Sequence, residues 1–480
     1  MDINRVKTDY EKYRDTIAAI STPPGEGGIG IVRMSGPLSL SIMEKLFVPA
    51  NIEISNTFSY APRHAYFGYF NDNSGNLIDD VICLYLKAPH TYTREDMVEI
   101  QAHGSPVSLR LILKALLSAG CRLAEPGEFT KLAFMNGRID LSQAEAVMDL
   151  ISAKTDTPHG IALKQLSGKL KEEIEEIRDK LRNVLAQITV NIDFPDEDIE
   201  QREYVHLISE LKSVKDKVEK IAITSETGRI ARDGVKVAIV GRPNVGKSSL
   251  MNGILGEDRA IVTNIPGTTR DTIEEQANFQ GIPIILTDTA GIRESDDVVE
   301  KIGIDRAKTH IESTDIVLFV IDGSEELREE DFAIIDLINK VKDGTGNSKK
   351  IIVVINKSDL PQRITDEDIS HLTPYSVIIH TSLIKFDGAE TVVKEIGKLV
   401  NNGTVISEMG NIITNERHTS ALNRAIVELK EAINGLEIND ALEMIEIPAH
   451  AAYDSLGEII GEAAGDEILD AVFTKFCLGK

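Results

Sequence analysis

The stretch Gly241-Arg242-Pro243-Asn244-Val245-Gly246-Lys247-Ser248 has the residue types and spacing of a phosphate-binding loop. Glycine at both ends allows the backbone to curl so that several N–H groups point at one anion. The stretch follows a β-branched run, 235–240, and a helix is expected from Ser249, which gives the strand–loop–helix context that the motif requires. Lys247 supplies positive charge and the Ser248 hydroxyl is placed for a magnesium ion. The pattern predicts a nucleoside triphosphate site.

Later segments identify the base. Asp288-Thr289-Ala290-Gly291 follows a predicted strand, so that Asp288 can hold magnesium through water and the Gly291 N–H can meet a γ-phosphate. In Asn356-Lys357-Ser358-Asp359, the Asp359 carboxylate can accept two hydrogen bonds from the N1–H and 2-amino groups of guanine. Adenine would leave that carboxylate unpaired, which is costly. Ser382 follows the last predicted strand and can contact the guanine carbonyl region through its backbone N–H. The ordered motifs predict GTP.

The predicted site draws on the whole middle of the chain. The segment 267–271 lies where a switch sensing the γ-phosphate belongs, and Thr269 in it is a second hydroxyl ligand for magnesium, beside Ser248 and Asp288. The predicted GTP contacts are Asn244, Val245, Gly246, Lys247, Ser248, Ser249, Thr263, Thr268, Thr269, Asp288, Thr289, Ala290, Gly291, Asn356, Lys357, Asp359 and Ser382.

The motifs do not identify the group that promotes hydrolysis. Many GTPases place a water-orienting Gln where this chain has Ile292, which cannot polarise water. Either hydrolysis is very slow or another group acts. A monovalent cation held by the Asn244 side chain and carbonyls of the 263–268 loop can replace an arginine finger. The other candidates are the carboxylates of Glu294, Asp296, Asp297 and Glu300 and the cations Arg270 and Arg293.

Composition excludes several classes of protein. The net charge of −25 over 480 residues argues against a general nucleic-acid coating protein, and the absence of Trp argues against a base-stacking platform. Three cysteines, Cys83, Cys121 and Cys477, lie far apart, which fits a reducing cytosol and hence a cytoplasmic location. No apolar run is long enough to span a bilayer, and the start is neither a signal nor a transit peptide.

Periodicity predicts a multidomain α/β plus all-α protein. Residues 1–120 read as a mixed α/β domain, with strands expected at 16–20, 30–33, 64–70, 81–86 and 97–101 and a helix over 105–119. Residues 121–233 read as helical, with a long amphipathic helix over 163–192 and another over 204–223. Residues 234–400 alternate strand and helix, which predicts a doubly wound, Ras-like P-loop domain. Residues 401–480 return to helix, so the α/β domain interrupts one discontinuous helical domain.

Segments outside the predicted nucleotide domain carry a family resemblance. The phosphate loop, Gly-Thr-Thr-Arg-Asp at 267–271 and Asp-Thr-Ala-Gly-Ile-Arg at 288–293 look like the potassium-activated GTPases of translation. The N-terminal run 22–33, the Glu-Pro-Gly-Glu-Phe turn at 125–129, Phe-Pro-Asp-Glu-Asp at 194–198 and the ending Cys-Leu-Gly-Lys at 477–480 together resemble the MnmE (TrmE) family of tRNA modification GTPases. The resemblance covers nearly the whole chain past residue 16.

The resemblance implies chemistry at the two ends of the chain. It implies a homodimer whose N-terminal domain binds a tetrahydrofolate derivative, 5-formyl- or 5,10-methylene-tetrahydrofolate, with contacts at Arg33, Glu99, Arg138 and Lys480. It implies a complex with the flavoprotein MnmG, which alone carries FAD, and the addition of a (carboxymethyl)aminomethyl group at C5 of the wobble uridine of certain tRNAs. It also favours a functional thiol at Cys477, otherwise a small packing residue.

For the GTPase, the resemblance implies that GTP brings the two G domains of the dimer together. It implies Glu300 as the water-orienting carboxylate and K⁺ held by Asn244, Thr263, Ile265 and Thr268. The alternative function is a ribosome-assembly GTPase switch of the same group, but the acidic chain offers no basic RNA-binding module. A third possibility, in which the G domain is a conformational switch for the partner, is compatible with the first.

Overall fold

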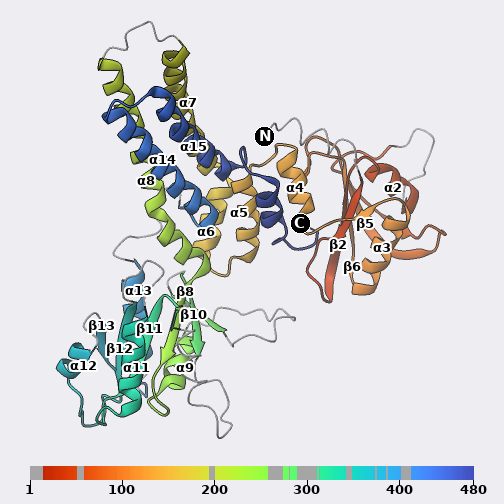
Figure 1. The fold of residues 1–480 in the computed structure, drawn as a ribbon. Coiled ribbons are helices and arrows are strands. Elements are labelled where there is room, and N and C mark those ends of the chain that lie inside the picture. Colours follow the sequence, from red (N-terminus) through yellow and green to blue (C-terminus); the bar gives the residue numbers. More distant parts are fainter. Residues whose placement is uncertain are drawn as a thin grey trace. The chain divides into compact units, whose positions relative to one another are not determined.

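The computed structural model describes residues 15–50, 59–193, 201–257, 274–279, 282–288, 311–312, 314–341, 349–372, 376–384, 388–401 and 412–479 (Figure 1). The chain forms two units. One contains residues 1–148, 165–216 and 421–480, and the other contains 149–164 and 217–420. No helix among the described residues is both long and apolar enough to cross a membrane.

The first unit holds a seven-stranded sheet in the order β3-β4-β5-β6-β2-β1-β7, antiparallel except for the β1–β7 pair. Its strands are β1 (Ile17–Ile20), β2 (Gly27–Ser35), β3 (Phe47–Pro49), β4 (Ala65–Asn71), β5 (Leu77–Leu86), β6 (Met97–Gly104) and β7 (Arg122–Leu123). The five predicted strands are confirmed. The sequence analysis missed β3 and β7, which are only three and two residues long and carry too little pattern to detect.

Alternating burial separates the two faces of this sheet. In β6, Val98 and Ile100 point to a core closed by α2 (Ser39–Leu46) and α3 (Pro106–Ser118). Met97 points to the opposite face, where Phe129 of α4 (Glu128–Met135) completes a second core. The helix predicted over 105–119 is α3, and the Ser105 hydroxyl accepts a hydrogen bond from the Val107 N–H as its cap.

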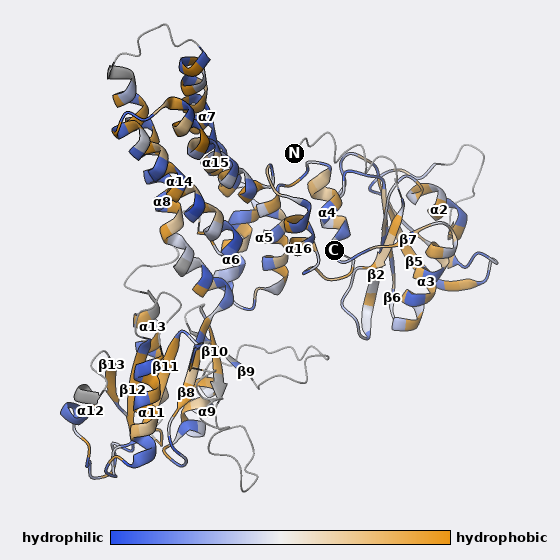
Figure 2. Ribbon diagram, in the orientation of Figure 1, coloured by the Kyte–Doolittle hydropathy of each residue, from blue (hydrophilic) through white to orange (hydrophobic). Residues whose placement is uncertain are grey.

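The helical part of the chain is built from amphipathic helices. These are α5 (Leu141–Ser152), α6 (Asp156–Leu166), α7 (Lys169–Asp193), α8 (Gln201–Asp233), α14 (Glu416–Glu437), α15 (Leu442–Ile460) and α16 (Asp466–Phe473). Buried residues of α7 recur at helical spacing, from Ile174 and Ile177 to Leu181 and Ile188, and α7 packs along α15. Figure 2 shows the alternation of apolar and polar residues along α7.

Two helix predictions need correction. The single helix expected over 163–192 is divided into α6 and α7, because Gly168 between them has φ +86°, the left-handed conformation that ends a helix. The helix expected over 204–223 is longer and runs to Asp233. The acidic turn at 194–198 lies outside the described residues.

The second unit contains the predicted doubly wound sheet, in the order β13-β12-β11-β8-β10-β9. The strands β8 (Val235–Val240), β10 (Ile282–Asp288), β11 (Ile316–Asp322), β12 (Lys350–Asn356) and β13 (Ser376–His380) are parallel, as predicted, and β9 (Glu274–Phe279) is antiparallel to β10. The sequence analysis missed β9, a polar edge strand. The parallel strands are apolar along their length, as expected for a sheet covered on both faces (Figure 2).

Helices cover both faces of this sheet. The core on one face includes Leu250 of α9 (Lys247–Glu257) and Val392 of α13 (Gly388–Asn401). The core on the other includes Ile338 of α11 (Glu329–Lys340) and Ile369 of α12 (Asp366–Leu372). The carboxyl ends of the parallel strands therefore share one edge, which is where a ligand of such a fold binds.

Candidate functional site

The phosphate loop follows β8 and has the backbone that its glycines allow. Gly241 and Gly246 have φ +153° and +109°. A Cβ on Gly241 would lie 2.3 Å from the Val320 carbonyl oxygen, and a Cβ on Gly246 would lie 2.3 Å from Nδ2 of Asn356. Both positions therefore require glycine for conformation and for space. Asn244, also at positive φ (+65°), is exposed at the tip of the loop.

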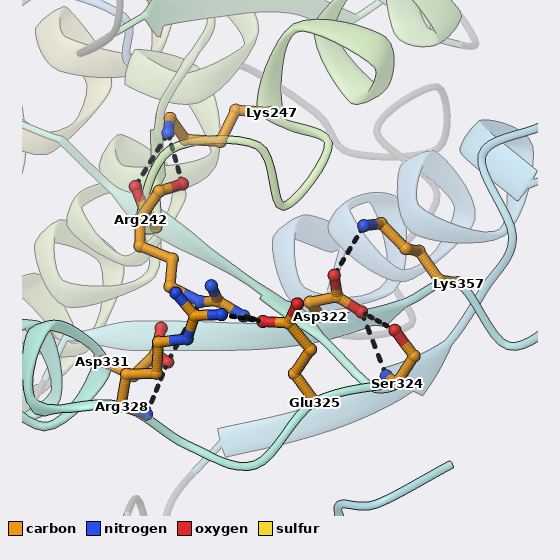
Figure 3. Close-up of polar contacts among 9 residues, drawn as sticks. Arg242, Lys247, Asp322, Ser324, Glu325, Arg328, Asp331 and Lys357 are labelled. Carbon is orange, nitrogen blue, oxygen red and sulfur yellow. Dashed lines mark hydrogen bonds and ion pairs between the residues drawn. The ribbon is translucent and has the colours of Figure 1, made fainter. Parts of the chain in front are cut away.

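The predicted phosphate-binding lysine is held by its own loop. Lys247 begins α9, and its Nζ donates hydrogen bonds to the carbonyl oxygens of Gly241 and Arg242, each at 2.8 Å (Figure 3). Ser248 and Ser249 are exposed in the first turn of the same helix, whereas Val245 is buried. A helix N-terminus with a lysine beside it favours a bound phosphate.

The base-recognition residues lie against this loop. Asn356, at the end of β12, is buried and donates from Nδ2 to the Val245 carbonyl at 2.7 Å. Its Oδ1 accepts the Leu383 N–H at 3.2 Å, and Ser382 donates its hydroxyl to Oδ1 of Asp359 at 2.5 Å. The structure thus brings together three segments predicted to bind GTP. Cα pairing of Asp288 with Ile239 places the end of β10 beside the end of β8.

Acidic residues at the end of β11 form a cluster that the sequence analysis did not identify. Oδ2 of Asp322 accepts the Lys357 ammonium at 2.5 Å, while its Oδ1 accepts the Ser324 N–H and hydroxyl (Figure 3). Burial opposes the charge of Asp322, but these hydrogen bonds outweigh it and lower the pKa of the carboxyl. Glu325 and Asp331 face Arg242 of the phosphate loop. Only the three-dimensional packing joins these charges, since nothing in their spacing signals it.

Most of the predicted switch residues of this site belong to segments that the structure does not describe. Outside the described residues lie Thr263, Ile265, Thr268, Thr269, Arg270, Thr289, Ala290, Gly291, Ile292, Arg293, Glu294, Asp296, Asp297 and Glu300. The backbone of Asp288 is described, but its side chain is not.

A second group of predicted residues comes together in the first unit. The Arg33 guanidinium pairs with Glu99 on the adjacent strand, with Nη2 at 2.8 Å from Oε1. Tyr92 lies near two cations, since its ring centroid is 6.0 Å from the guanidinium carbon of Arg33 and 4.7 Å from that of Arg138. Burial raises the pKa of Tyr92, so the phenol stays neutral. One carboxylate and two cations around an aromatic ring suit a planar, anionic ligand.

The C-terminal tail packs against this same unit. The Ser21 hydroxyl donates to the Gly479 carbonyl at 3.1 Å. Gly479 has φ +89°, and a Cβ there would lie 2.3 Å from the Ile20 carbonyl oxygen. Cys477 is exposed two residues earlier, and Lys480 lies outside the described residues. The tail therefore ends beside β1 rather than among the helices that precede it.

Comparisons with known proteins now add to this geometry. Residues 16–138 match a family model described as the GTP-binding protein TrmE N-terminus, and residues 141–477 match the MnmE helical domain. A tRNA modification GTPase MnmE from Clostridioides difficile is 45% identical over 97% of this chain and 99% of its own length. The chain belongs to the MnmE family of tRNA modification GTPases. A second MnmE relative, from Bacillus velezensis, is 43% identical over 97% of this chain and 100% of its own.

The MnmE family model spans the inserted α/β sheet as well as the flanking helices. Among solved structures, a variant of Aquifex aeolicus Era bound to GDP·AlF4⁻ is 32% identical over 40% of this chain and 66% of its own. The TM-score is 0.26, so the fold assignment rests on the strands and helices described above.

We predict that Asp322→Asn lowers stability in a pH-dependent way. The folded-state pKa of Asp322 is lowered from about 3.8, so its charge stabilises the fold above that pH and stops doing so as the pH falls through the lowered value. At pH 7 the variant should lose about 1–2 kcal/mol. Urea unfolding at pH 7 and pH 3 measures the difference in unfolding free energy between the wild-type chain and the variant. This difference should be smaller at pH 3.

The matched control is Asp336→Asn on the exposed face of α11, where an ion pair with Lys340 contributes about 0.5 kcal/mol or less. If Asp322→Asn lowered the free energy of unfolding equally at both pH values, the claim that the charge of Asp322 stabilises the fold would be wrong.

Proposed function

We propose that this chain hydrolyses GTP in the modification of tRNA, acting with the flavoprotein MnmG to add a (carboxymethyl)aminomethyl group at C5 of wobble uridines. The observation that carries the proposal is the bond from Asn356 to Val245, which joins the base-recognition loop to the phosphate loop in a chain related along its length to MnmE proteins. The Asp359 carboxylate selects guanine, and the two loops together fix the spacing between the base site and the phosphate site.

In this proposal metal ions supply the charge stabilisation. Mg²⁺ is bound by Ser248, Thr269 and, through water, Asp288. K⁺ is bound by Asn244 with Thr263, Ile265 and Thr268, and takes the place of an arginine finger. Support comes from Asn244 itself, since its positive φ and exposure leave the side-chain amide at the tip of the loop. Glu300 orients the attacking water, with Arg270 as an auxiliary cation.

The proposed one-carbon chemistry takes place at the other site. A tetrahydrofolate derivative, 5-formyl- or 5,10-methylene-tetrahydrofolate, is bound by Glu99, Arg33, Arg138 and Lys480, with its planar ring near Tyr92. The carboxylate pairs with the N–H edge of the pterin and the cations pair with the glutamate tail. Cys477 takes part in the modification step, and FAD is supplied only by MnmG.

The proposed domains are 1–120 for folate binding and dimerisation, 121–233 and 401–480 for the helical domain, and 234–400 for the G domain. The protein is proposed to act in the cytoplasm as a homodimer. An exposed apolar face on β3, β4 and β5 supports a second copy as the partner, because Val48, Phe67, Tyr69 and Ile82 all lie on it. GTP binding then brings the two G domains together.

Potassium should accelerate GTP hydrolysis relative to sodium at equal ionic strength. Asn244→Ala should reduce the rate in K⁺ by about 10- to 100-fold, because a charge-stabilising ligand is lost, and should leave the rate in Na⁺ nearly unchanged. Steady-state phosphate release measures both rates. The control is Asn252→Ala on the exposed side of α9. Equal rates in K⁺ and Na⁺ for the wild-type chain would remove Asn244 from this role.

Glu99→Gln should weaken binding of 5-formyl-tetrahydrofolate by about 10- to 100-fold, because a charge-assisted hydrogen bond to the pterin is lost. Isothermal titration calorimetry measures the affinity, and GTP hydrolysis by the same variant should be unchanged. Glu44→Gln on the exposed side of α2 is the matched control. Wild-type folate affinity in the Glu99 variant would contradict the proposed site.

A further inference from the structure

We propose that Arg242 is a positioning residue of the phosphate loop, and that Glu325 and Asp331 hold it in place so that Lys247 is correctly presented to a phosphate. The inference rests on the proposed binding of GTP by this loop. It assigns a role to a position that the phosphate-loop signature leaves open, and to an acidic cluster that the signature does not include.

The side chain of Arg242 is buried and has two acidic partners. It is 9% exposed, its Nη2 lies 2.6 Å from Oε2 of Glu325, and its Nε lies 3.3 Å from Oδ2 of Asp331. Burial opposes the charge of the guanidinium, but the hydrogen bond to Glu325 and the nearby carboxylates more than compensate and raise the pKa of Arg242. The arginine therefore stays charged in place.

A buried ion pair of this kind is weak evidence for added stability, because removing both charges from water offsets most of their attraction. An apolar side chain could fill the same space. The pair provides a fixed geometry, because the planar guanidinium donates hydrogen bonds only in certain directions. The role of this pair therefore lies in what Arg242 positions.

The backbone of Arg242 holds Lys247. The Arg242 carbonyl accepts one of the two hydrogen bonds from the Lys247 ammonium, and the Gly241 carbonyl accepts the other. Gly241 is already fixed by its close approach to the Val320 carbonyl on β11. The side chain of Arg242 reaches residues that follow β11. Figure 3 shows the continuous path from Lys247 through Arg242 to Glu325 and Asp331.

The acidic end of this path includes a buried residue, Asp331. Asp331 is 1% exposed, and its Oδ2 accepts the Arg328 N–H at 3.0 Å in the first turn of α11. Oε2 of Glu325, the oxygen that pairs with Arg242, also accepts the exposed Arg328 guanidinium at 2.8 Å. Ile335 and Ile338 of α11 are buried in the core on one face of the sheet, so Arg242 ties the phosphate loop to a packed helix.

The test is Glu325→Gln in the full chain, which preserves the shape of a half-exposed side chain and removes one charge. GDP affinity should fall about tenfold, because Lys247 reaches the outer phosphates, while GMP affinity should stay within about twofold. Competition against a fluorescently labelled guanine nucleotide measures both affinities. A general loosening of the site would weaken both nucleotides, whereas displacement of Lys247 lowers the ratio of GDP to GMP affinity.

Arg328→Gln is the matched control, since the Arg328 side chain is 56% exposed and its ion pair with Glu325, which is also exposed, contributes little. It should keep wild-type affinity. Arg242→Gln should lower the GDP to GMP ratio at least as far as Glu325→Gln, Arg242→Lys should recover part of it, and the double variant should lose no more than the larger single one. Thermal melts identify any variant that fails to fold.

Two results would overturn the proposal: an unchanged GDP to GMP ratio in Glu325→Gln, or an equal loss in Arg328→Gln. Failure of the wild-type chain to bind GDP would instead contradict the proposed function on which this inference rests.

Discussion

The buried side chain of Asn356 provides the interaction on which the nucleotide site depends. One amide donates to the Val245 carbonyl and accepts the Leu383 N–H, so it holds the phosphate loop and the last base-recognition segment at once. A buried amide that lost either partner would cost the desolvation of an unpaired polar group. Gly246 makes the approach possible, because a Cβ there would lie 2.3 Å from Nδ2 of Asn356. The hydrogen bonds of Asn356 therefore require glycine at position 246.

The same edge of the sheet carries the charges that hold the loops. Lys357 pairs with Asp322 and Arg242 pairs with Glu325, so cations from the base loop and the phosphate loop contact the end of β11 and the segment that follows it. The buried charges of Arg242 and Asp322 are tolerated there because each has a close partner of opposite sign. In this account the segment is a shared support, and the loops that bind the nucleotide gain their geometry from it.

The sequence predicted the doubly wound sheet and its phosphate loop well, because long apolar strands and a glycine-lysine signature are strong local signals. It did not predict the cluster around Asp331, since a charged residue in the first turn of a helix gives the same local pattern whether it caps the helix, pairs with an arginine or faces water. It missed the short strands β3 and β7 and the polar strand β9, and it joined α6 to α7 across Gly168. Thr269 and Glu300 lie outside the described residues, so their roles stay predictions.

The central claim is that an intact GTP site in this chain is needed for modification of wobble uridines in tRNA. The most direct measurement is nucleoside mass spectrometry of tRNA from cells that lack the gene, complemented with the wild-type chain or with Asn356→Ala. The account predicts that the modified uridine is lost on deletion, returns with the wild-type chain, and does not return with an equally expressed Asn356→Ala variant. Unchanged wobble uridines in the deletion strain, or full restoration by Asn356→Ala, would contradict it.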